Sequence, residues 1–408
     1  MKYSRDVVFN YLDEYINNIK GQLDTYKTKN PLLKSYIFET FNEDLVTSSN
    51  GWLENSLDLN IILNREKVLY KQIDEKFFVL GNKKSPFGFL EIINNRFFVI
   101  YSIDNADYSD KVANNIVKNS SLVDSLWVSG KMFNSFLHQV KNQHHLNRYI
   151  KMNFEYQNIY NLHVNEGQLE YKEDYVMEEP TKISLSKEIG EITEHIDLIR
   201  KILPEFNSIT SMRFPTLCKG GKGGHHFYYN GKVTNRSNNF MDHRHQIFET
   251  VNTYQKITED IESNVWLDYE LIKSPNNQYN FSFQGSPIVF KFGKRLKRNV
   301  FRNFIESTFP KGKEPFKILA EPQWISEERV HIYGVDLHLW QEVMMDLSLD
   351  EFTVFIPKGT CGNTVHRLAT NFQKYLDPTI EIWIGNEKYE NVINRNMHPF
   401  VGRDNFNV

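Results

Sequence analysis

The sequence of 408 residues contains 48 Lys and Arg, 51 Asp and Glu and 13 His, which gives a formal net charge of −3 at pH 7. This length exceeds the size at which one hydrophobic core usually keeps growing, so two or three domains are expected. A charged fraction of 24% and an aromatic fraction of 14% argue against intrinsic disorder and low complexity.

The N-terminal segment is predicted to be an amphipathic helix over residues 4–28, because its apolar residues recur every three or four positions. It lacks the uninterrupted apolar core of a signal peptide, and no stretch of the chain approaches the roughly 18 apolar residues that span a membrane. Only two cysteines occur, Cys218 and Cys361, which excludes an intrachain disulfide framework and a cysteine-rich zinc site. We therefore expect a soluble cytoplasmic protein without a membrane span.

The following segments predict strands, then helix, then strand. Residues 107–145 have helical periodicity, and the segment at 148–156 returns to β-forming residues. Because strands arrive in consecutive runs and do not alternate with helices, the first domain, residues 1–165, is predicted to be α+β with mainly antiparallel sheets and packed helices. The four predicted strands before the helical segment are LDLNIILN, KFFVL, FGFLEII and RFFVIYSI.

The acidic segment at residues 166–180 predicts a domain boundary or a long connector. A second breaking segment, rich in Asn, Ser and Pro, lies at residues 274–287. The middle domain, residues 181–273, is predicted to contain a helix at 185–203, a strand at 208–215, a hairpin at 225–236 and a helix at 241–262.

The C-terminal domain, residues 287–408, is predicted to be α+β as well. Its apparent order of elements is βαββαβ, which is compatible with a ferredoxin-like arrangement. That comparison concerns the fold and carries no function.

Positive charge is concentrated in two segments. Residues 213–245 hold six cations and one carboxylate, a net charge of +5, and residues 291–313 hold eight cations and one carboxylate, a net charge of +7. The rest of the chain therefore sums to −15, a segregation that suits a polyanionic partner, although a solvated basic face is the alternative. The candidate polyanion-binding residues are Arg213, Lys219, Lys222, Lys232, Arg236, Arg244, Lys294, Arg295, Arg298 and Arg302.

Two turn signals occur in the first of these segments. Gly220, Gly221, Gly223 and Gly224 would let the backbone approach an anion closely, but their spacing matches neither a Walker A loop nor a dinucleotide-binding loop, and a plain surface loop is the alternative. The pair Asn230–Gly231 predicts a two-residue type I′ turn closing the hairpin.

A metal-dependent nuclease is the sharper alternative for the same segment. A strand pair followed by a helix could bring together His226, Asn239 and His243 or His245, as in ββα-metal nucleases, and would then require a divalent metal ion. The match is incomplete, because His225 and His226 point to opposite faces of a strand and no adjacent carboxylate orients the first histidine. No other cofactor is predicted.

The segment around Cys361 offers two further possibilities. A cysteine hydrolase would pair Cys361 with His366, but five residues of helix separate them by about 500°. Thr360, Asn363 or Thr364 is a better candidate for capping the helix, whose free N–H groups would form an anion site.

The sequence therefore favours a protein that binds DNA, RNA or another polyanion, as a non-catalytic subunit of a larger bacterial or phage-related assembly. The bacterial assignment follows from abundant Lys, Asn, Ile and Tyr, which suggest an AT-rich genome. The metal-dependent nuclease and a protein-binding scaffold remain the alternatives.

Overall fold

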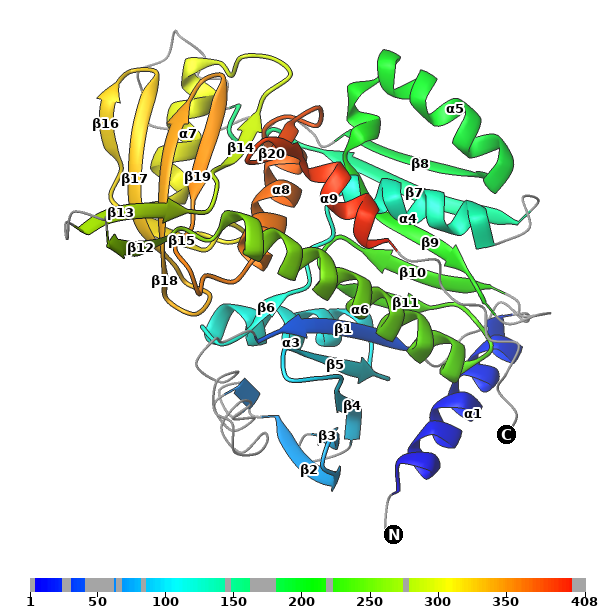
Figure 1. Ribbon diagram of the computed structural model, residues 1–408. Coiled ribbons are helices and arrows are strands. Elements are labelled where there is room, and N and C mark those ends of the chain that lie inside the picture. Colours follow the sequence, from blue (N-terminus) through cyan, green and yellow to red (C-terminus); the bar gives the residue numbers. More distant parts are fainter. Residues whose placement is uncertain are drawn as a thin grey trace, which may run out of the picture.

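The chain has a mixed α+β structure with two large antiparallel sheets and a separate two-stranded hairpin, which confirms the predicted fold class (Figure 1). Within the described part of the chain, the helices are too short or too polar to cross a membrane. The computed structural model describes residues 4–23, 31–40, 62–63, 68–81, 86–143, 148–161, 181–217, 223–273 and 279–397.

The larger sheet has eleven strands, and its strands come from both the predicted first domain and the predicted middle domain. This sheet therefore continues across the boundary predicted at residues 166–180. Its strand order is β2-β3-β4-β5-β1-β11-β10-β9-β7-β8, with β6 beside β1. The strands are β1 (Lys34–Glu39), β2 (Leu69–Asp74), β3 (Phe77–Gly81), β4 (Pro86–Ile92), β5 (Phe97–Ser102), β6 (Asp124–Ser125), β7 (Tyr149–Tyr156), β8 (Thr181–Glu188), β9 (Ile209–Pro215), β10 (Gly224–Tyr228) and β11 (Lys232–Asn235).

The two faces of the larger sheet are covered differently. On one face, the main core of the protein packs Phe227 and Val233 of the sheet against three helices. On the opposite face, helix α3 (Ala106–Asn119) packs on Tyr36 and Ile100 of β1 and β5. Because successive residues of a strand point to opposite faces, the neighbours of Phe227 and Val233 lie on the face of α3. The helices of the first face are α1 (Arg5–Leu23), α4 (Gly130–Gln143) and α6 (Phe240–Val265).

The smaller sheet has eight strands and begins at Ile288, within the predicted C-terminal domain. A βαββαβ order can be traced through four of its strands, which lie in the order β20-β14-β19-β18 with every neighbouring pair antiparallel. The strand expected at residues 329–338 is β17, however, and β18 was not predicted. Three further strands, β15 to β17, are inserted after helix α7. The strands are β14 (Ile288–Lys291), β15 (Ile318–Ala320), β16 (Gln323–Ser326), β17 (Arg329–Asp336), β18 (Gln341–Ser348), β19 (Glu351–Phe355), β20 (Glu381–Ile384) and β21 (Glu387–Lys388).

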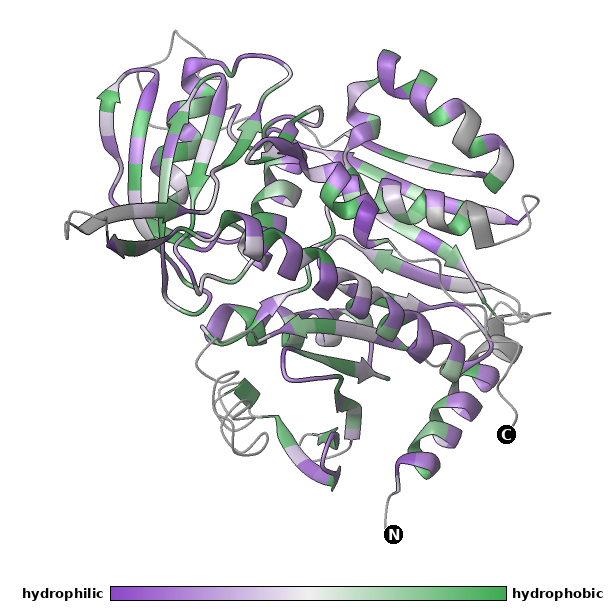
Figure 2. Ribbon diagram, viewed as in Figure 1, coloured by the Kyte–Doolittle hydropathy of each residue, from purple (hydrophilic) through white to green (hydrophobic). Residues whose placement is uncertain are grey.

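Helices α7 (Arg298–Thr308) and α8 (Asn363–Tyr375) pack on one face of this sheet. Phe304 of α7 and Phe372 of α8 both contact Phe352 of β19, with ring centroids 5.6 and 5.2 Å apart. Buried and more exposed residues alternate along β18, and Figure 2 shows the matching alternation of hydrophobic and hydrophilic residues in this sheet. The remaining elements are α5 (Ile189–Ile202), η2 (Pro204–Asn207), α9 (Tyr389–Asn396) and the hairpin of β12 (Asp268–Lys273) and β13 (Tyr279–Gln284).

Several sequence-based assignments differ from the structure. The breaking segment predicted at residues 274–287 contains strand β13, which pairs with β12 along its whole length. The helix predicted at 185–203 begins only at Ile189, because residues 181–188 pair along the whole length of β7 as strand β8. The helical segment predicted at 107–145 is divided into α3 and α4, with the short strand β6 between them. The strand predicted at residues 57–64 lies outside the described residues except for Ile62 and Leu63, which are helical.

The hairpin of β10 and β11 forms as predicted, but its turn is different. Phe227 pairs with Val233, so the loop has three residues, Tyr229–Gly231, and Gly231 N donates to Tyr228 O at 3.1 Å. Of these loop residues, Gly231 has a positive φ of 73° and Asn230 does not, whereas a type I′ turn needs a positive φ at both central positions. The turn is therefore a type I turn followed by a glycine bulge.

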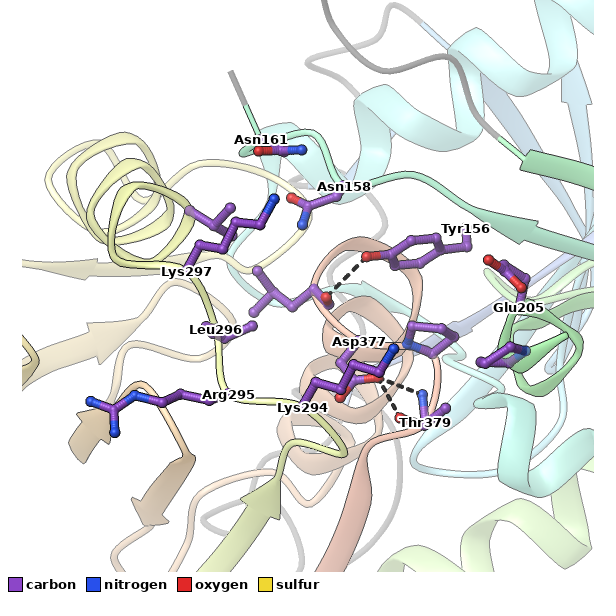
Figure 3. A pocket seen from close by; sticks show the side chains of 14 residues that line it. Tyr156, Asn158, Asn161, Glu205, Lys294, Arg295, Leu296, Lys297, Asp377 and Thr379 are labelled. Carbon is purple, nitrogen blue, oxygen red and sulfur yellow. Dashed lines mark hydrogen bonds between the residues drawn. The ribbon is translucent and has the colours of Figure 1, made fainter. Parts of the chain in front are cut away.

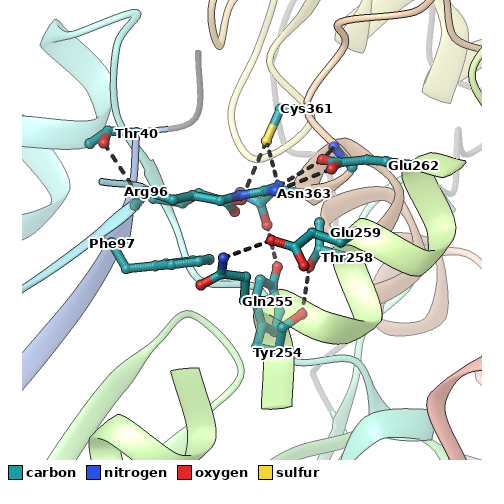
Figure 4. Close-up of polar contacts among 12 residues, drawn as sticks. Thr40, Arg96, Phe97, Tyr254, Gln255, Thr258, Glu259, Glu262, Cys361 and Asn363 are labelled. Carbon is teal, nitrogen blue, oxygen red and sulfur yellow. Dashed lines mark hydrogen bonds and ion pairs between the residues drawn. The ribbon is translucent and has the colours of Figure 1, made fainter. Parts of the chain in front are cut away.

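Two buried arginines connect the larger sheet to the C-terminal part of the chain. Arg96 donates to Glu39 of β1 at 2.5 Å and to Glu262 of α6 at 2.7 Å, beside Cys361 (Figure 4). Arg367 of α8 is fully buried and donates to Asp124 of β6 and Asp336 of β17. Each arginine thus satisfies carboxylates from separate parts of the fold.

We predict that Arg367→Met lowers the free energy of unfolding by about 3–5 kcal/mol, because it leaves two buried carboxylates without a cation. Urea unfolding followed by circular dichroism measures this loss. The control is Arg329→Ala, whose pair with Asp346 is partly exposed and whose removal should cost about 1 kcal/mol or less. Equal losses for both variants would contradict the role assigned to Arg367.

Candidate anion-binding face

One row of polar side chains crosses the larger sheet on the face of α3, beyond the strands that α3 covers. The strand register aligns Lys151 of β7 with Arg213 of β9, and Arg213 with His226 of β10. The row continues to Ser186 of β8 on one side and to Thr234 of β11 on the other. Lys151 and Ser186 are exposed, Arg213 is half-buried and His226 is buried, so the row runs from solvent towards the interior. We call Lys151, Arg213, His226 and the neighbouring Arg236 the cationic face.

The register places Lys151 and Arg213 directly opposite each other. Side chains in such a pair have Cβ atoms about 4.5–5.5 Å apart, and like charges there are destabilising. Within the described ranges, no carboxylate forms an ion pair with Lys151, Arg213 or Arg236. The pKa of Arg213 is lowered, first by burial and then by the charge of Arg236. The cationic face therefore holds positive charges that repel one another.

The pKa of His226 depends on this positive charge. Its Nε2 lies 2.9 Å from Ser211 Oγ, and its ring stacks on Tyr228 with a centroid distance of 4.5 Å. The imidazole is neutral at pH 7, and a bound anion would raise its pKa. The pKa of His226 is lowered to about 4, first by burial and then by four cations, Arg236, Arg213, Lys151 and Lys232.

A pocket of about 360 Å³ opens at the end of the cationic face, where β7 begins and β9 ends. Arg148, Lys151 and Arg213 line it together with Tyr149. Arg148 Nη2 donates to Thr216 Oγ1 at 3.4 Å, so this guanidinium is held by a neutral group. Three cations thus converge on one pocket.

Gly223 and Gly224, next to the pocket, allow neighbouring backbone segments to approach closely. Gly223 has a φ of 84°, and a Cβ atom there would lie 1.9 Å from the carbonyl oxygen of Arg236. The amide of Arg236 donates to the carbonyl of Gly224 at 2.8 Å. These two glycines bring Arg236 to the start of β10, whereas Gly220 and Gly221 lie outside the described residues.

The other candidate cations of residues 213–245 are separated from the cationic face or paired. Lys232 donates to Asp110 at 2.6 Å, and Arg244 forms a bidentate ion pair with Glu91 with distances of 2.7 and 2.9 Å. Lys219 and Lys222 lie outside the described residues.

Three of the eight cations in the basic segment at residues 291–313 form ion pairs with acids of the C-terminal part. Arg295 and Arg298 both bind Glu328, at 2.5 and 2.6 Å, and Arg302 lies 3.8 Å from Glu306. Lys294, Arg295 and Lys297 line a second pocket, of about 260 Å³, between the C-terminal part and the end of β7 (Figure 3). The structure therefore does not bring this segment onto the cationic face.

The predicted nuclease residues do not converge. His225, not His226, faces α6, where its Nδ1 lies 3.0 Å from His243 Nδ1. His226 lies on the opposite face of the sheet, as its contact with Ser211 shows. Asn239 caps α6 by accepting from the amide of Asp242 at 2.7 Å. Among the residues with described positions, no group of three His, Cys, Asp or Glu side chains is arranged to hold a metal ion.

The contacts of His225 and His243 form a closed network. His225 Nε2 lies 2.9 Å from a carboxylate oxygen of Asp242, and His243 Nε2 lies 2.8 Å from Ser35 Oγ. All four side chains are buried, and burial lowers the pKa of His243 well below its usual value. His245 is half-buried beside this network on α6 and takes no part in the contacts described. His225 and His243 thus have a structural role.

The predicted anion site at the start of α8 is filled by acids of the protein itself. Glu262 accepts from the amide of Gly362 at 2.7 Å, and Thr364 Oγ1 donates to Asp336 at 2.5 Å. Asn363 donates to the carbonyl of Ser125. Thr360 is buried as well, so these residues are closed to an external anion.

The cysteine hydrolase alternative is also not supported by the geometry. Cys361 is buried next to Glu39 and Arg96, and burial raises the pKa of its thiol well above the usual value. His366 contacts Tyr389 Oη at 2.6 Å and Thr258 instead.

Sequence reasoning missed Arg148, Tyr149 and Lys151. The segment RYIKMNFEY was recognised as a strand, and its alternation places Tyr149, Lys151 and Asn153 on one face. The pairing of this strand with β9, more than 50 residues later, could not be read from that pattern. The available signal was the polar face of the strand predicted at residues 148–156, together with the basic residue Arg213 on another predicted strand.

We predict that Lys151→Gln raises the pKa of His226 above about 4, because it removes one of the cations that lower it. A histidine with a lowered pKa binds a proton more readily in the unfolded chain, so its contribution to stability is lost as pH falls from about 6.5 towards about 4. The variant should therefore lose less stability between pH 7 and pH 5. NMR titration of His226 and urea unfolding at both pH values test this; an unchanged pKa would contradict the proximity of these side chains.

Comparison with known proteins places the chain in a family. The chain is 26% identical, over 333 residues, to the protein MJECL33 of Methanocaldococcus jannaschii, which is described as uncharacterized, and the match covers 75% of this chain and 78% of that protein. No solved structure matches the chain significantly. The family model described as "MJECL33-like protein" matches residues 2–391. The chain therefore belongs to the MJECL33-like protein family.

Proposed function

We propose that this protein binds a nucleic acid or another polyanion through the cationic face. The observation that carries the proposal is the register of Lys151 against Arg213, two cations with no ion-pair partner among the described carboxylates. Such a pair is unfavourable in the free protein, and an anion bound between the two side chains would remove the repulsion. Arg236 adds to the same charge, as its effect on the pKa of Arg213 indicates.

Phosphate groups suit this arrangement. Arginine binds phosphate oxygens in a bidentate manner, and lysine contributes a mobile point charge. Contacts of this kind give affinity that depends on salt and does not depend on base sequence.

We further propose that the protein acts in the cytoplasm as a non-catalytic subunit of a larger assembly. The bacterial origin inferred from composition stays a prediction, since the relative named above is archaeal.

Fluorescence anisotropy with labelled DNA and RNA across a salt series tests the proposal. We expect Lys151→Ala/Arg213→Ala to weaken binding and to reduce the magnitude of the slope of log K against log [salt] by about 1.5, because two phosphate contacts are lost. The matched control is Arg295→Ala/Arg298→Ala, which removes the same charge from residues paired with Glu328.

The control variant should keep the wild-type slope. If the control weakens binding and the first variant does not, the polyanion is bound by the C-terminal part and the cationic face is the wrong site. Absence of binding by the wild type at low salt would remove the proposed function.

A protein-binding role is favoured by one separate observation. Tyr269 of β12 pairs with Phe283 of β13, and these two side chains and Leu271 lie on one face of the hairpin with exposures of 61%, 80% and 57%. Apolar side chains gathered on an exposed face are typical of protein contacts. We propose that this hairpin contacts a protein partner.

For this contact, we expect Phe283→Ser to abolish retention of a partner that the wild type retains in co-purification from the native host, while Phe283→Tyr keeps it. Both variants should unfold at the wild-type urea concentration, because the side chain is exposed. A partner retained equally by Phe283→Ser would exclude the hairpin as the contact.

A further inference from the structure

We propose that the cationic face selects single-stranded nucleic acid, with an unpaired base stacked on Tyr149. This inference rests on the proposed function, because it names the class of polyanion that the same face binds.

Tyr149 has the position and exposure of a stacking platform. It is 65% exposed, whereas many of the described aromatic side chains are buried in the cores. It precedes Lys151 by two residues on β7, so both side chains lie on the same face of the sheet. Glu188 of β8 is opposite Tyr149 in register. The ring is thus available to a ligand at the edge of the cationic face.

Aromatic rings and cations together bind single strands in many proteins. A base stacks on the ring through its π-face while the neighbouring phosphates contact lysine and arginine. Arg148 and Arg213 line the same pocket as Tyr149, so both kinds of contact are available within one site.

The size of the pocket favours a single strand over a duplex. A volume of about 360 Å³ lies at the low end of the range for small-ligand sites, which is suitable for one nucleotide. The bases of a duplex are stacked on one another and reach such a pocket only after the cost of unstacking and unpairing. An unpaired strand does not have that cost.

The polar groups beside the cationic face predict tolerance of base sequence. Asn153 Nδ2 donates to Ser211 Oγ at 2.7 Å, and Ser211 Oγ also contacts His226 Nε2 at 2.9 Å. Because these groups bond to one another, they are engaged before any base arrives. We therefore expect stacking and phosphate contacts to dominate over recognition of base edges.

The experiment compares wild type, Tyr149→Ala and Tyr149→Phe by anisotropy, with one labelled 20-nucleotide DNA as a single strand and as a duplex. We expect the wild type to bind the single strand more tightly than the duplex. Tyr149→Ala should weaken single-strand binding by about 5- to 150-fold and leave duplex binding unchanged. Tyr149→Phe, which keeps the ring, should retain the wild-type affinity. The matched control is Tyr333→Ala, which removes a tyrosine that is 56% exposed on β17 of the other sheet.

The outcomes separate this inference from the proposed function. If wild type binds duplex and single strand equally, or if Tyr149→Ala behaves like Tyr333→Ala, the single-strand inference is overturned while polyanion binding stands. If neither DNA nor inorganic polyphosphate binds at low salt, the proposed function itself has failed. Loss of single-strand affinity in Tyr149→Ala, with Tyr149→Phe unaffected, supports the inference.

Discussion

A buried guanidinium needs carboxylates in contact with it, because the loss of hydration is otherwise too costly. Arg367 and Arg96 meet this requirement by drawing acids from elements far apart in the chain. Asp124 lies beside β1 of the larger sheet, and Asp336 ends a strand of the smaller sheet. Arg367 therefore joins the two large sheets through buried ion pairs, and Arg96 joins the larger sheet to α6.

Many carboxylates of the chain likewise lie next to cations. The sequence has a surplus of carboxylates outside its two basic segments, and the structure uses many of them as partners for cations. Glu328 pairs with Arg295 and Arg298, and Glu91 pairs with Arg244. Lys151, Arg213 and Arg236 receive no such partner among the described carboxylates. Among the described residues, the cationic face is one place where local positive charge exceeds local neutralisation, which is a condition for binding a polyanion.

Elements with a local sequence pattern were predicted better than features that depend on strand pairing. Elements with a strong and local pattern were predicted correctly, such as α6 and the hairpin before it. Strand β8 was missed because its alternating residues also fit the start of a helix, and its pairing with β7 decides between the two. The turn at Gly231 differed for a similar reason, since the register of β10 and β11 sets the length of the loop. The histidine cluster was predicted with the wrong member, because the face that α6 covers selects His225.

The sequence by itself determined the α+β class and the concentration of positive charge around Arg213. These properties depend on composition and on periodicity within a few residues, so they are present before the chain folds. Tertiary structure alone decided which cations remain unpaired, since pairing depends on which acids lie within about 4 Å and those acids are distant in sequence. It also placed Lys151 and Tyr149 beside Arg213. Strands β7 and β9 are separated in sequence by β8 and α5, and they become neighbours only when the chain folds.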